Sequence, residues 1–329
     1  MRPLRFEQTY RDEWSELEAS LEEITTRRGR PAASLNQAPA SGARIATLYR
    51  RACDHLALAR ARAYPAYIVD RLERMTARAH QAIYYRREYG VARLRRFVTH
   101  DFPSTVRAHS GYVTVAAAVF LLPTLALGVL VYLRPELILS VVSSDAVASF
   151  EEMYSPAARS IGRLRTASTD WMMFGYYIRN NISIAFQCFA SGLFGGIGSV
   201  FFLAYNGAFA GAIGGYLTSR GFSSTFYPFI STHSAFELTA IVLSGAAGLR
   251  IGHALLAPGR LTRIQSLTTA SKDAIVLVYG VTGMLIVAAV VEAFWSSARW
   301  LPAQVKYGVA AACWTAVLGY FAFQGRRAD

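Results

Sequence analysis

Charged residues are scarce in this chain of 329 residues: they make up 17% of it, whereas hydrophobic residues make up 53%. A typical soluble domain has about 25% charged residues. The deficit is uneven, because the chain up to Arg107 holds twenty arginines and twelve acidic residues, or roughly +8 of the net charge of +13. Long uncharged runs follow. The pattern excludes one soluble globular domain and indicates a basic soluble part followed by a membrane part.

Cysteine is also rare, with only Cys53, Cys188 and Cys313. Their odd number and wide spacing exclude a disulfide framework and suggest neither a metal site nor a redox site, so we expect packing roles. The first residues, Met1 to Glu7, contain no apolar stretch of the kind found in a signal peptide. We therefore expect the first apolar span to act as the insertion signal.

The common catalytic motifs are missing as well. The sequence contains no His-Glu-x-x-His, no Gly-x-Ser-x-Gly, no phosphate-binding loop and no dinucleotide fingerprint. We therefore expect no cofactor, and a protein that is not an enzyme. No nucleic-acid recognition motif accompanies the basic charge, so we expect lipid headgroups, and not nucleic acid, as its partner.

The first part of the chain is predicted to be a basic helical domain, residues 1–108, on the cytoplasmic side. Apolar residues at three- and four-residue steps predict an amphipathic helix over 6–27. A loop rich in proline, alanine and serine follows at 29–42. Two further helices are expected at 43–62 and 66–89, separated by Pro65.

The second part, residues 109–329, is predicted to be a polytopic membrane bundle, which makes the whole chain all-α. Asn206-Gly207 is taken as a turn within the uncharged run 180–219, and residues 134–178 as an extracytoplasmic loop. The uncharged runs then predict six spans, near 112–133, 180–204, 207–219, 231–256, 274–295 and 303–324.

Six spans place both termini on the same side of the membrane. The basic first domain, the connection from Arg260 to Lys272 and the pair Arg326-Arg327 then all lie inside, as the positive-inside rule expects. We predict an integral membrane protein with both termini in the cytoplasm.

Polar residues inside the apolar half form a candidate site near the outer membrane boundary. His233 and Glu237 are four residues apart and share a helix face, and Glu292 is the obvious third member. Three roles are open for these residues. They can form a structural hydrogen-bonded cluster in which Arg179 pairs with a glutamate, or they can relay protons or ions. Alternatively, His233, Glu237 and Glu292 can bind a metal ion. The full predicted cluster is Arg179, Asn180, Asn181, Asn206, His233, Glu237 and Glu292.

Glycines crowd the same half of the chain. Gly207, Gly211 and Gly215 recur at steps of four, which lets helix backbones approach closely. We expect close helix packing, and homo-oligomerisation, through Gly192, Gly196, Gly207, Gly211, Gly215, Gly245 and Gly248. A pore or a mobile gate is the alternative.

Several of these residues resemble the signature of the stage II sporulation protein M family of bacterial membrane proteins. The run Phe236–Gly252 carries most of the resemblance, and Ser234 and Thr239 depart from the family pattern His-Gly-x-x-Glu-Leu-Pro-Ala. The other matching positions are Asn180-Asn181, Tyr205-Asn206-Gly207, His233 with Glu237, and Val291-Glu292-Ala293-Phe294. The N-terminal stretches Leu48-Tyr49-Arg50, Asp54 to Arg62, Arg78-Ala79-His80 and Tyr84-Tyr85-Arg86 look like the helical extension of the branch found outside sporulation.

The resemblance implies a component of a multiprotein assembly in the bacterial cytoplasmic (inner) membrane. In spore formers such proteins scaffold peptidoglycan-remodelling enzymes, and elsewhere they accompany a MoxR-type AAA+ ATPase and a von Willebrand-like domain protein. We therefore expect a scaffold that recruits cytoplasmic and envelope partners. The alternatives are a transporter, channel or lipid-handling protein that uses His233, Glu237 and Glu292, and an intramembrane metal-dependent hydrolase.

Overall fold

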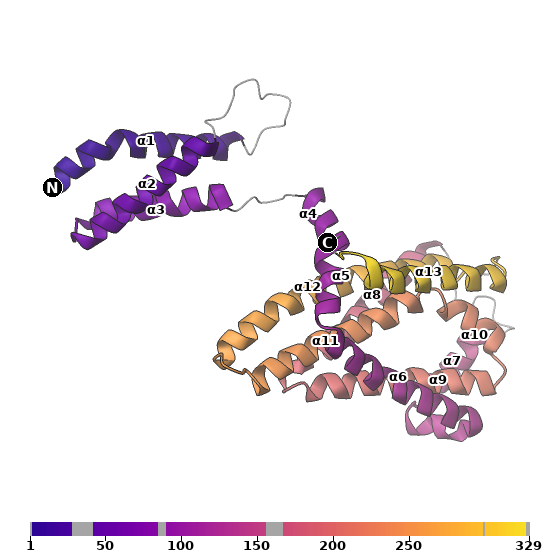
Figure 1. The fold of residues 1–329 in the computed structure, drawn as a ribbon. Coiled ribbons are helices and arrows are strands. Elements are labelled where there is room, and N and C mark those ends of the chain that lie inside the picture. The colour runs from indigo at the N-terminus through magenta and orange to yellow at the C-terminus, as the bar shows by residue number, and fades with distance from the viewer. Residues whose placement is uncertain (1, 28–41, 85–89, 156–166, 299, 327–329) are drawn as a thin grey trace. The chain divides into compact units, whose positions relative to one another are not determined.

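A computed structural model gives the fold, which is helical and contains no strand in the residues that it describes (Figure 1). By contacts the chain divides into two compact units, Met1–Ala92 (unit 1) and Arg93–Asp329 (unit 2). The structure describes residues 2–27, 42–84, 90–155, 167–298 and 300–326.

Unit 1 contains three helices, α1 (Pro3–Arg27), α2 (Gly42–Ala61) and α3 (Ala66–Tyr84). They confirm the three predicted helices; residues 85–89, the expected end of the third, lie outside the described residues. Each helix turns an apolar stripe inward because its apolar residues recur with the helical period. The resulting core is aromatic and aliphatic, and its members include Phe6, Trp14, Leu17, Leu48, Ile68, Leu72 and Met75.

Unit 2 contains the remaining helices. Six of them are long: α6 (Ser110–Leu133), α8 (Ala167–Ala190), α9 (Ile197–Ser219), α11 (Ser234–Leu256), α12 (Arg263–Val290) and α13 (Ala303–Phe323). Two shorter helices precede α6, namely α4 (Val91–Arg96), whose first two residues fall in unit 1, and α5 (Phe102–Ala108). Two others lie between long helices, α7 (Ser144–Tyr154) and α10 (Ser223–Ile230). Two π-helical segments, Phe97–Asp101 and Val291–Ser296, and two 3-10 turns, Pro135–Ser140 and Ser191–Leu193, complete the order.

The boundary between the units comes before the expected position at 108. The reason is packing: the Phe102 ring of α5 lies 5.4 Å from that of Phe321, centroid to centroid. The Arg107 guanidinium donates hydrogen bonds to the carbonyls of Phe321 and Gln324, at 3.0 and 2.6 Å. Arg107 therefore belongs to unit 2, although it was expected to lie within the basic domain 1–108.

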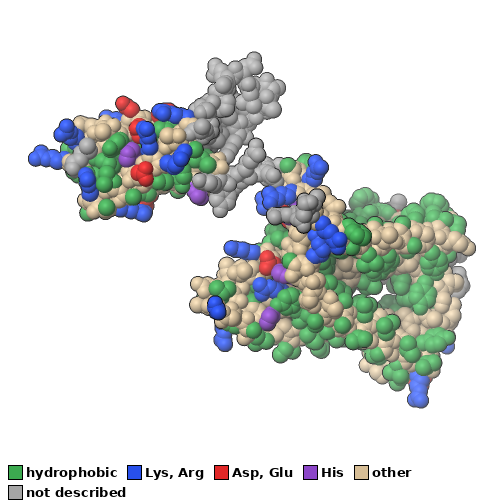
Figure 2. All heavy atoms as spheres, in the orientation of Figure 1, with side chains coloured by type: hydrophobic (Ala, Val, Ile, Leu, Met, Phe, Trp, Pro, Cys, Tyr) green, Lys and Arg blue, Asp and Glu red, His purple; other side chains and the backbone are tan. Residues whose placement is uncertain are grey.

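Within the residues that the structure describes, five helices are long and apolar enough to cross a membrane, by length and composition. They are α6, α9, α11, α13 and α12 together with its π-helical end. Figure 2 shows the corresponding surfaces: hydrophobic side chains dominate the visible face of unit 2, whereas charged side chains are spread over unit 1. The prediction of a polytopic helical membrane protein is confirmed.

Two predicted span boundaries were wrong. Asn206-Gly207 is not a turn, because α9 runs unbroken through both residues. The chain turns earlier, between Ser191 and Gly196, where Gly195 and Gly196 adopt φ of 64° and 83°. Only glycine takes this left-handed conformation without a steric penalty. The predicted spans 180–204 and 207–219 are thus replaced by α8 and α9, and α8 begins inside the expected loop 134–178.

Helix directions follow from the residues that face each other. Along α6 and α9, Phe120 faces Gly207 and Gly128 faces Gly215, so these two helices run parallel. Leu203 of α9 faces Gly245, and Gly196, just before α9, faces Gly252, so α9 and α11 are antiparallel. Because α6 and α9 point the same way, the chain must run back to the starting side of unit 2 after α6 and before α9. The long helix in that part of the sequence is α8.

Glycines set the closeness of these helix pairs. A Cβ atom at Gly207, Gly211 or Gly215 would overlap the backbone carbonyl oxygens of Phe120, Thr124 and Gly128, respectively. Gly192 and Gly248 meet backbone to backbone, Gly196 lies against Gly252, and Gly245 lies under the Leu203 side chain. Such contacts replace the hydrophobic effect, which gives little attraction between helices in lipid.

Candidate functional site

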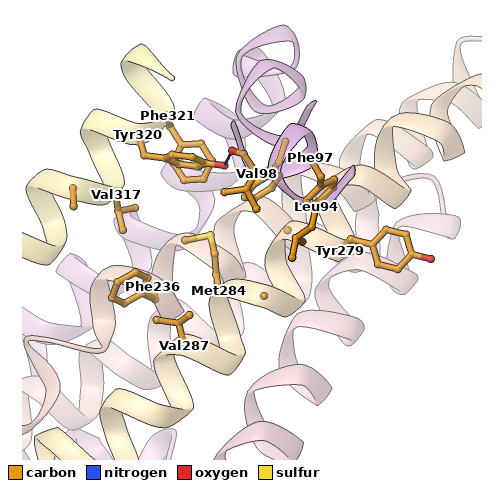
Figure 3. Close-up of a pocket in the computed structure, with 14 residues that line it drawn as sticks. Leu94, Phe97, Val98, Phe236, Tyr279, Met284, Val287, Val317, Tyr320 and Phe321 are labelled. Carbon is orange, nitrogen blue, oxygen red and sulfur yellow. Dashed lines mark hydrogen bonds between the residues drawn. The ribbon is translucent and has the colours of Figure 1, made fainter. Parts of the chain in front are cut away.

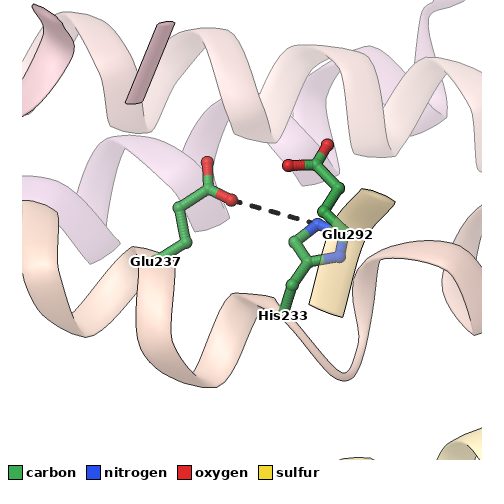
Figure 4. A group of neighbouring side chains, drawn as sticks. All are labelled: His233, Glu237 and Glu292. Carbon is green, nitrogen blue, oxygen red and sulfur yellow. Dashed lines mark ion pairs between the residues drawn. The ribbon is translucent and has the colours of Figure 1, made fainter. Parts of the chain in front are cut away.

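Three titratable side chains converge at one end of unit 2. His233 lies in the turn before α11, Glu237 is one helical turn further along, and Glu292 comes from the π-helical end of α12 (Figure 4). One ligand atom from each lies within 4.8 Å of the other two. Figure 4 shows Glu237 facing the imidazole of His233, with 4.0 Å between Oε2 and Nε2. We call these residues the His–Glu cluster.

A buried polar network holds the histidine. Nδ1 of His233 lies 3.0 Å from the Ser296 hydroxyl, which is fully buried. The Lys306 ammonium donates a 2.7 Å hydrogen bond to the Ser296 carbonyl, although this lysine is only 2% exposed. Thr232 donates to the Lys306 carbonyl at 3.4 Å. These bonds tie the first residues of α11 and α13 to the end of α12.

Two more polar side chains approach the His–Glu cluster. Asn181 of α8 is 2% exposed, accepts a 3.0 Å hydrogen bond from Asn180, and places its amide beside the Glu237 carboxylate. Tyr154, at the end of α7, is buried outside the candidate spans. Burial, with Glu292 and other nearby groups, raises the pKa of the Tyr154 phenol above its ordinary value.

Two other predicted members lie elsewhere. Arg179 is exposed and makes no ion pair with a described residue, so the structure does not show the pairing with a glutamate that was one of the alternatives. Asn206 is half-buried in the middle of α9 and donates a 2.7 Å hydrogen bond to the Phe202 carbonyl. The structure brings together Asn181, His233, Glu237 and Glu292, and separates Arg179 and Asn206 from them.

A cavity of about 710 Å³ reaches the His–Glu cluster from between α6, α8, α9, α10 and α11. Asn180, Asn206, His233 and Glu237 contribute polar groups to its wall. The rest of the wall is mostly apolar, and its backbone surface includes Gly211 and other glycines of the α6–α9 contact. The cavity therefore offers an apolar chamber with a polar end.

A second cavity, of about 440 Å³, has almost no polar lining. Its wall comes from the segment 94–102, α11, α12 and α13 (Figure 3). Figure 3 shows the Tyr320 hydroxyl at its edge, where it donates a 2.6 Å hydrogen bond to the Val98 carbonyl. No cluster of titratable residues occurs among its lining residues, so this cavity lacks the polar groups that the larger one has.

Sequence reasoning missed Lys306, Ser296 and Tyr154. Lys306 left a usable signal, because it is one of only two lysines in the chain and falls inside an otherwise apolar run. An ionisable residue within a span usually faces the protein interior and a partner. Ser296 and Tyr154 left no such signal, since serine and tyrosine are common at helix ends.

The His–Glu cluster can do one of two things chemically. One imidazole and two carboxylates can share and pass protons, or they can bind a cation through one nitrogen and two oxygen atoms. Two carboxylates this close repel each other unless a proton or a cation compensates their charge. In both cases Ser296 holds the imidazole of His233 and Asn181 lies beside the carboxylate of Glu237.

Comparison with protein families gives two matches. The family model described as Stage II sporulation protein M matches residues 116–297, which is more than half of the chain. A domain of unknown function, DUF8413, matches residues 4–85 and covers the three helices of unit 1. Comparisons with curated proteins and with solved structures each found no match. The chain therefore belongs to the stage II sporulation protein M family, and carries an added helical unit at its N-terminus.

Proposed function

We propose that this protein is a membrane scaffold that recruits cytoplasmic and envelope partners into one assembly. The observation that carries the proposal is the division of the chain: unit 1 has a core of its own, and unit 2 has five helices suited to a membrane. A charged helical unit attached to a membrane bundle offers a docking surface for a partner without needing a catalytic group.

The proposed topology places both termini in the cytoplasm and the His–Glu cluster near the outer boundary of the inner membrane. Parallel α6 and α9 support it, because a crossing by α8 between them brings the count to six. Arg107, Arg260 and Arg326 then lie on one side, as positive-inside orientation requires. Reporter fusions after residues 155 and 257 test it: an external first fusion and a cytoplasmic second one are expected.

A MoxR-type ATPase is the cytoplasmic partner to test first, with a von Willebrand-like domain protein as the second. The full chain and a variant lacking residues 1–92 are each purified from membranes that also contain a MoxR-type ATPase from the same cell. We expect the full chain to co-purify with the ATPase and the shortened variant to insert normally but lose it. Equal capture by both variants would contradict a recruiting role for unit 1.

A second function, transport or handling of a lipid-like molecule, is favoured by the cavity of about 710 Å³. Its apolar wall suits an acyl chain, and its polar end, with Asn180, His233 and Glu237, suits a headgroup. Asn180 comes from α8, His233 and Glu237 come from the start of α11, and residues of α6 and α9 line the apolar wall. A ligand in the cavity would therefore touch α6, α8, α9 and α11 at once.

Thiol labelling tests this second function. In a background without Cys53, Cys188 and Cys313, we compare Ser234→Cys, which lines the cavity, with Ser244→Cys, which is buried and donates to the Ala185 carbonyl. A membrane-impermeant reagent should label the first and spare the second. Protection of both positions would show that the cavity is closed to water and would count against a transport path.

A further inference from the structure

We propose that the His–Glu cluster is a binding site for one divalent transition-metal ion, of which zinc is the best fit. The donors are Nε2 of His233 and one carboxylate oxygen each from Glu237 and Glu292. One imidazole and two carboxylates are borderline-to-hard ligands, which suit Zn²⁺ or Mn²⁺ better than a softer ion. The site would join the start of α11 to the end of α12.

The spacing of the donor atoms carries the first part of the argument. The three lie within 4.8 Å of one another, whereas metal bonds of about 2.0–2.2 Å in a tetrahedral site place ligand atoms roughly 3.4 Å apart. Small side-chain rotations of Glu237 and Glu292 close this gap, because both carboxylates end flexible side chains. The helices that hold them need not move.

The contact with Ser296 carries the second part. A proton on Nδ1 of His233, donated to the Ser296 hydroxyl, leaves the lone pair of Nε2 directed toward the carboxylate of Glu237. Metal-binding histidines are usually held in this way, through a hydrogen bond at the ring nitrogen that does not bind the ion. The Lys306 ammonium in turn holds the backbone of Ser296.

The buried amide of Asn181 is the third observation. Its side-chain nitrogen lies beside the Glu237 carboxylate but forms no well-aligned hydrogen bond with a described residue. A buried donor without a good acceptor destabilises the folded state. When one Glu237 oxygen turns onto a metal ion, the other oxygen is free to accept from this amide.

Access to the ion comes from the larger cavity. His233 and Glu237 line its wall, so a fourth coordination position facing the cavity can take a water molecule or an oxygen of a bound ligand. With three protein ligands and one open position, the ion would fix the polar part of an amphipathic molecule whose apolar part lies along the wall.

Metal binding by the full chain tests the proposal. The detergent-purified protein is stripped with a chelator and titrated with Zn²⁺, Mn²⁺ and Mg²⁺, and bound metal is measured by mass spectrometry. We expect about one Zn²⁺ per chain, weaker Mn²⁺ and no Mg²⁺, since Mg²⁺ favours sites made of oxygen ligands alone. Co²⁺ in place of Zn²⁺ should give visible absorption bands of a four-coordinate ion.

Variants separate this site from accidental binding. His233→Ala, Glu237→Gln and Glu292→Gln should each lose the ion, whereas Ser296→Ala, a positioning change, should weaken binding about 10- to 100-fold. Glu136→Gln, an exposed acidic position outside the cluster, should bind as the wild type does. Each variant is first checked for a cooperative thermal transition, and Glu237→Gln keeps the size of the side chain it replaces.

Two results would overturn the proposal. The first is a wild-type protein that binds none of these ions, which would leave a proton shared between the carboxylates. The second is Zn²⁺ that binds equally well after Glu237→Gln and Glu292→Gln, which would mean adventitious binding only. Neither result would affect capture of partners by unit 1.

Discussion

The two units are both helical bundles, but they place polar and apolar groups in opposite ways. In unit 1 the charged side chains lie outside, where ion pairs such as Arg71–Glu18 and Arg51–Glu13 link neighbouring helices at 2.8 and 2.6 Å. In unit 2 large apolar side chains face outward, as Leu122 and Leu125 do at 66% and 65% exposure. Its interior holds a histidine, glutamates and a lysine.

The difference shows that one helical pattern is stabilised by different forces in different surroundings. Unit 1 is stabilised by the hydrophobic effect, because folding removes large side chains such as Trp14 from water. Unit 2 is held by close backbone contact at glycines and by buried hydrogen bonds, because lipid gives no hydrophobic drive between helices. Substitutions should therefore act differently on the two units.

Loss of a large core side chain should give the largest effect. Trp14→Ala removes a side chain that is 1% exposed, packs edge-on against Phe6 and donates to Nδ1 of His55. We expect a loss of about 3–5 kcal/mol in unit 1 alone. Hydrogen exchange of α1–α3 in the full chain should speed up while α6 and α9 stay protected. The exposed Leu4→Ala serves as the control, and faster exchange in α9 would contradict independent units.

Adding a single methyl group should have the next largest effect, and only in unit 2. Gly211→Ala would push a Cβ into the Thr124 carbonyl, so we expect a cost of about 1–3 kcal/mol and a lower melting temperature in detergent. Gly214→Ala in the same helix meets only the edge of the Phe226 ring at 3.8 Å and should be harmless. Equal melting temperatures of the two variants would show that α6 and α9 do not depend on this contact.

The buried lysine should have a comparable or somewhat smaller effect. Lys306→Met leaves the Ser296 carbonyl without its donor, at a cost of about 1–3 kcal/mol. The only other lysine, Lys272, is exposed, and Lys272→Met provides a matched control. Thermal unfolding in detergent should distinguish the two variants. Identical curves would mean that Lys306 finds no stabilising partner in the membrane.

A pH effect should be the smallest, and it belongs to unit 1. Burial lowers the pKa of the His55 imidazole, and Nδ1 accepts the Trp14 hydrogen bond, so protonation favours the unfolded state. The stability of unit 1 should be full above the unfolded pKa of about 6.5 and fall as the pH drops below it. Hydrogen exchange of α1–α3 at about pH 7.5 and about pH 5.5 should show it. His55→Gln should reduce the difference, and an unchanged difference would assign it to other groups.

Sequence alone determined the class of the protein and most of its helices. Apolar periodicity placed α1–α3, and uncharged runs placed α6, α11 and α13 to within a few residues, because both signals are local. The His233–Glu237 pair was visible for the same reason, since four residues make one helical turn. The family resemblance, which rested on these residues, is borne out by the family match.

Tertiary structure decided the rest. Asn-Gly is a local turn signal, yet α9 continues through Asn206-Gly207, because Gly207 packs against the α6 backbone. The turn before α9 is formed instead by Gly195 and Gly196. The convergence of Glu292 with His233 depends on how α11 and α12 pack, and Lys306 joins them from a third helix. Spacing along a helix fixes which residues share its face, but only packing between helices fixes which faces meet.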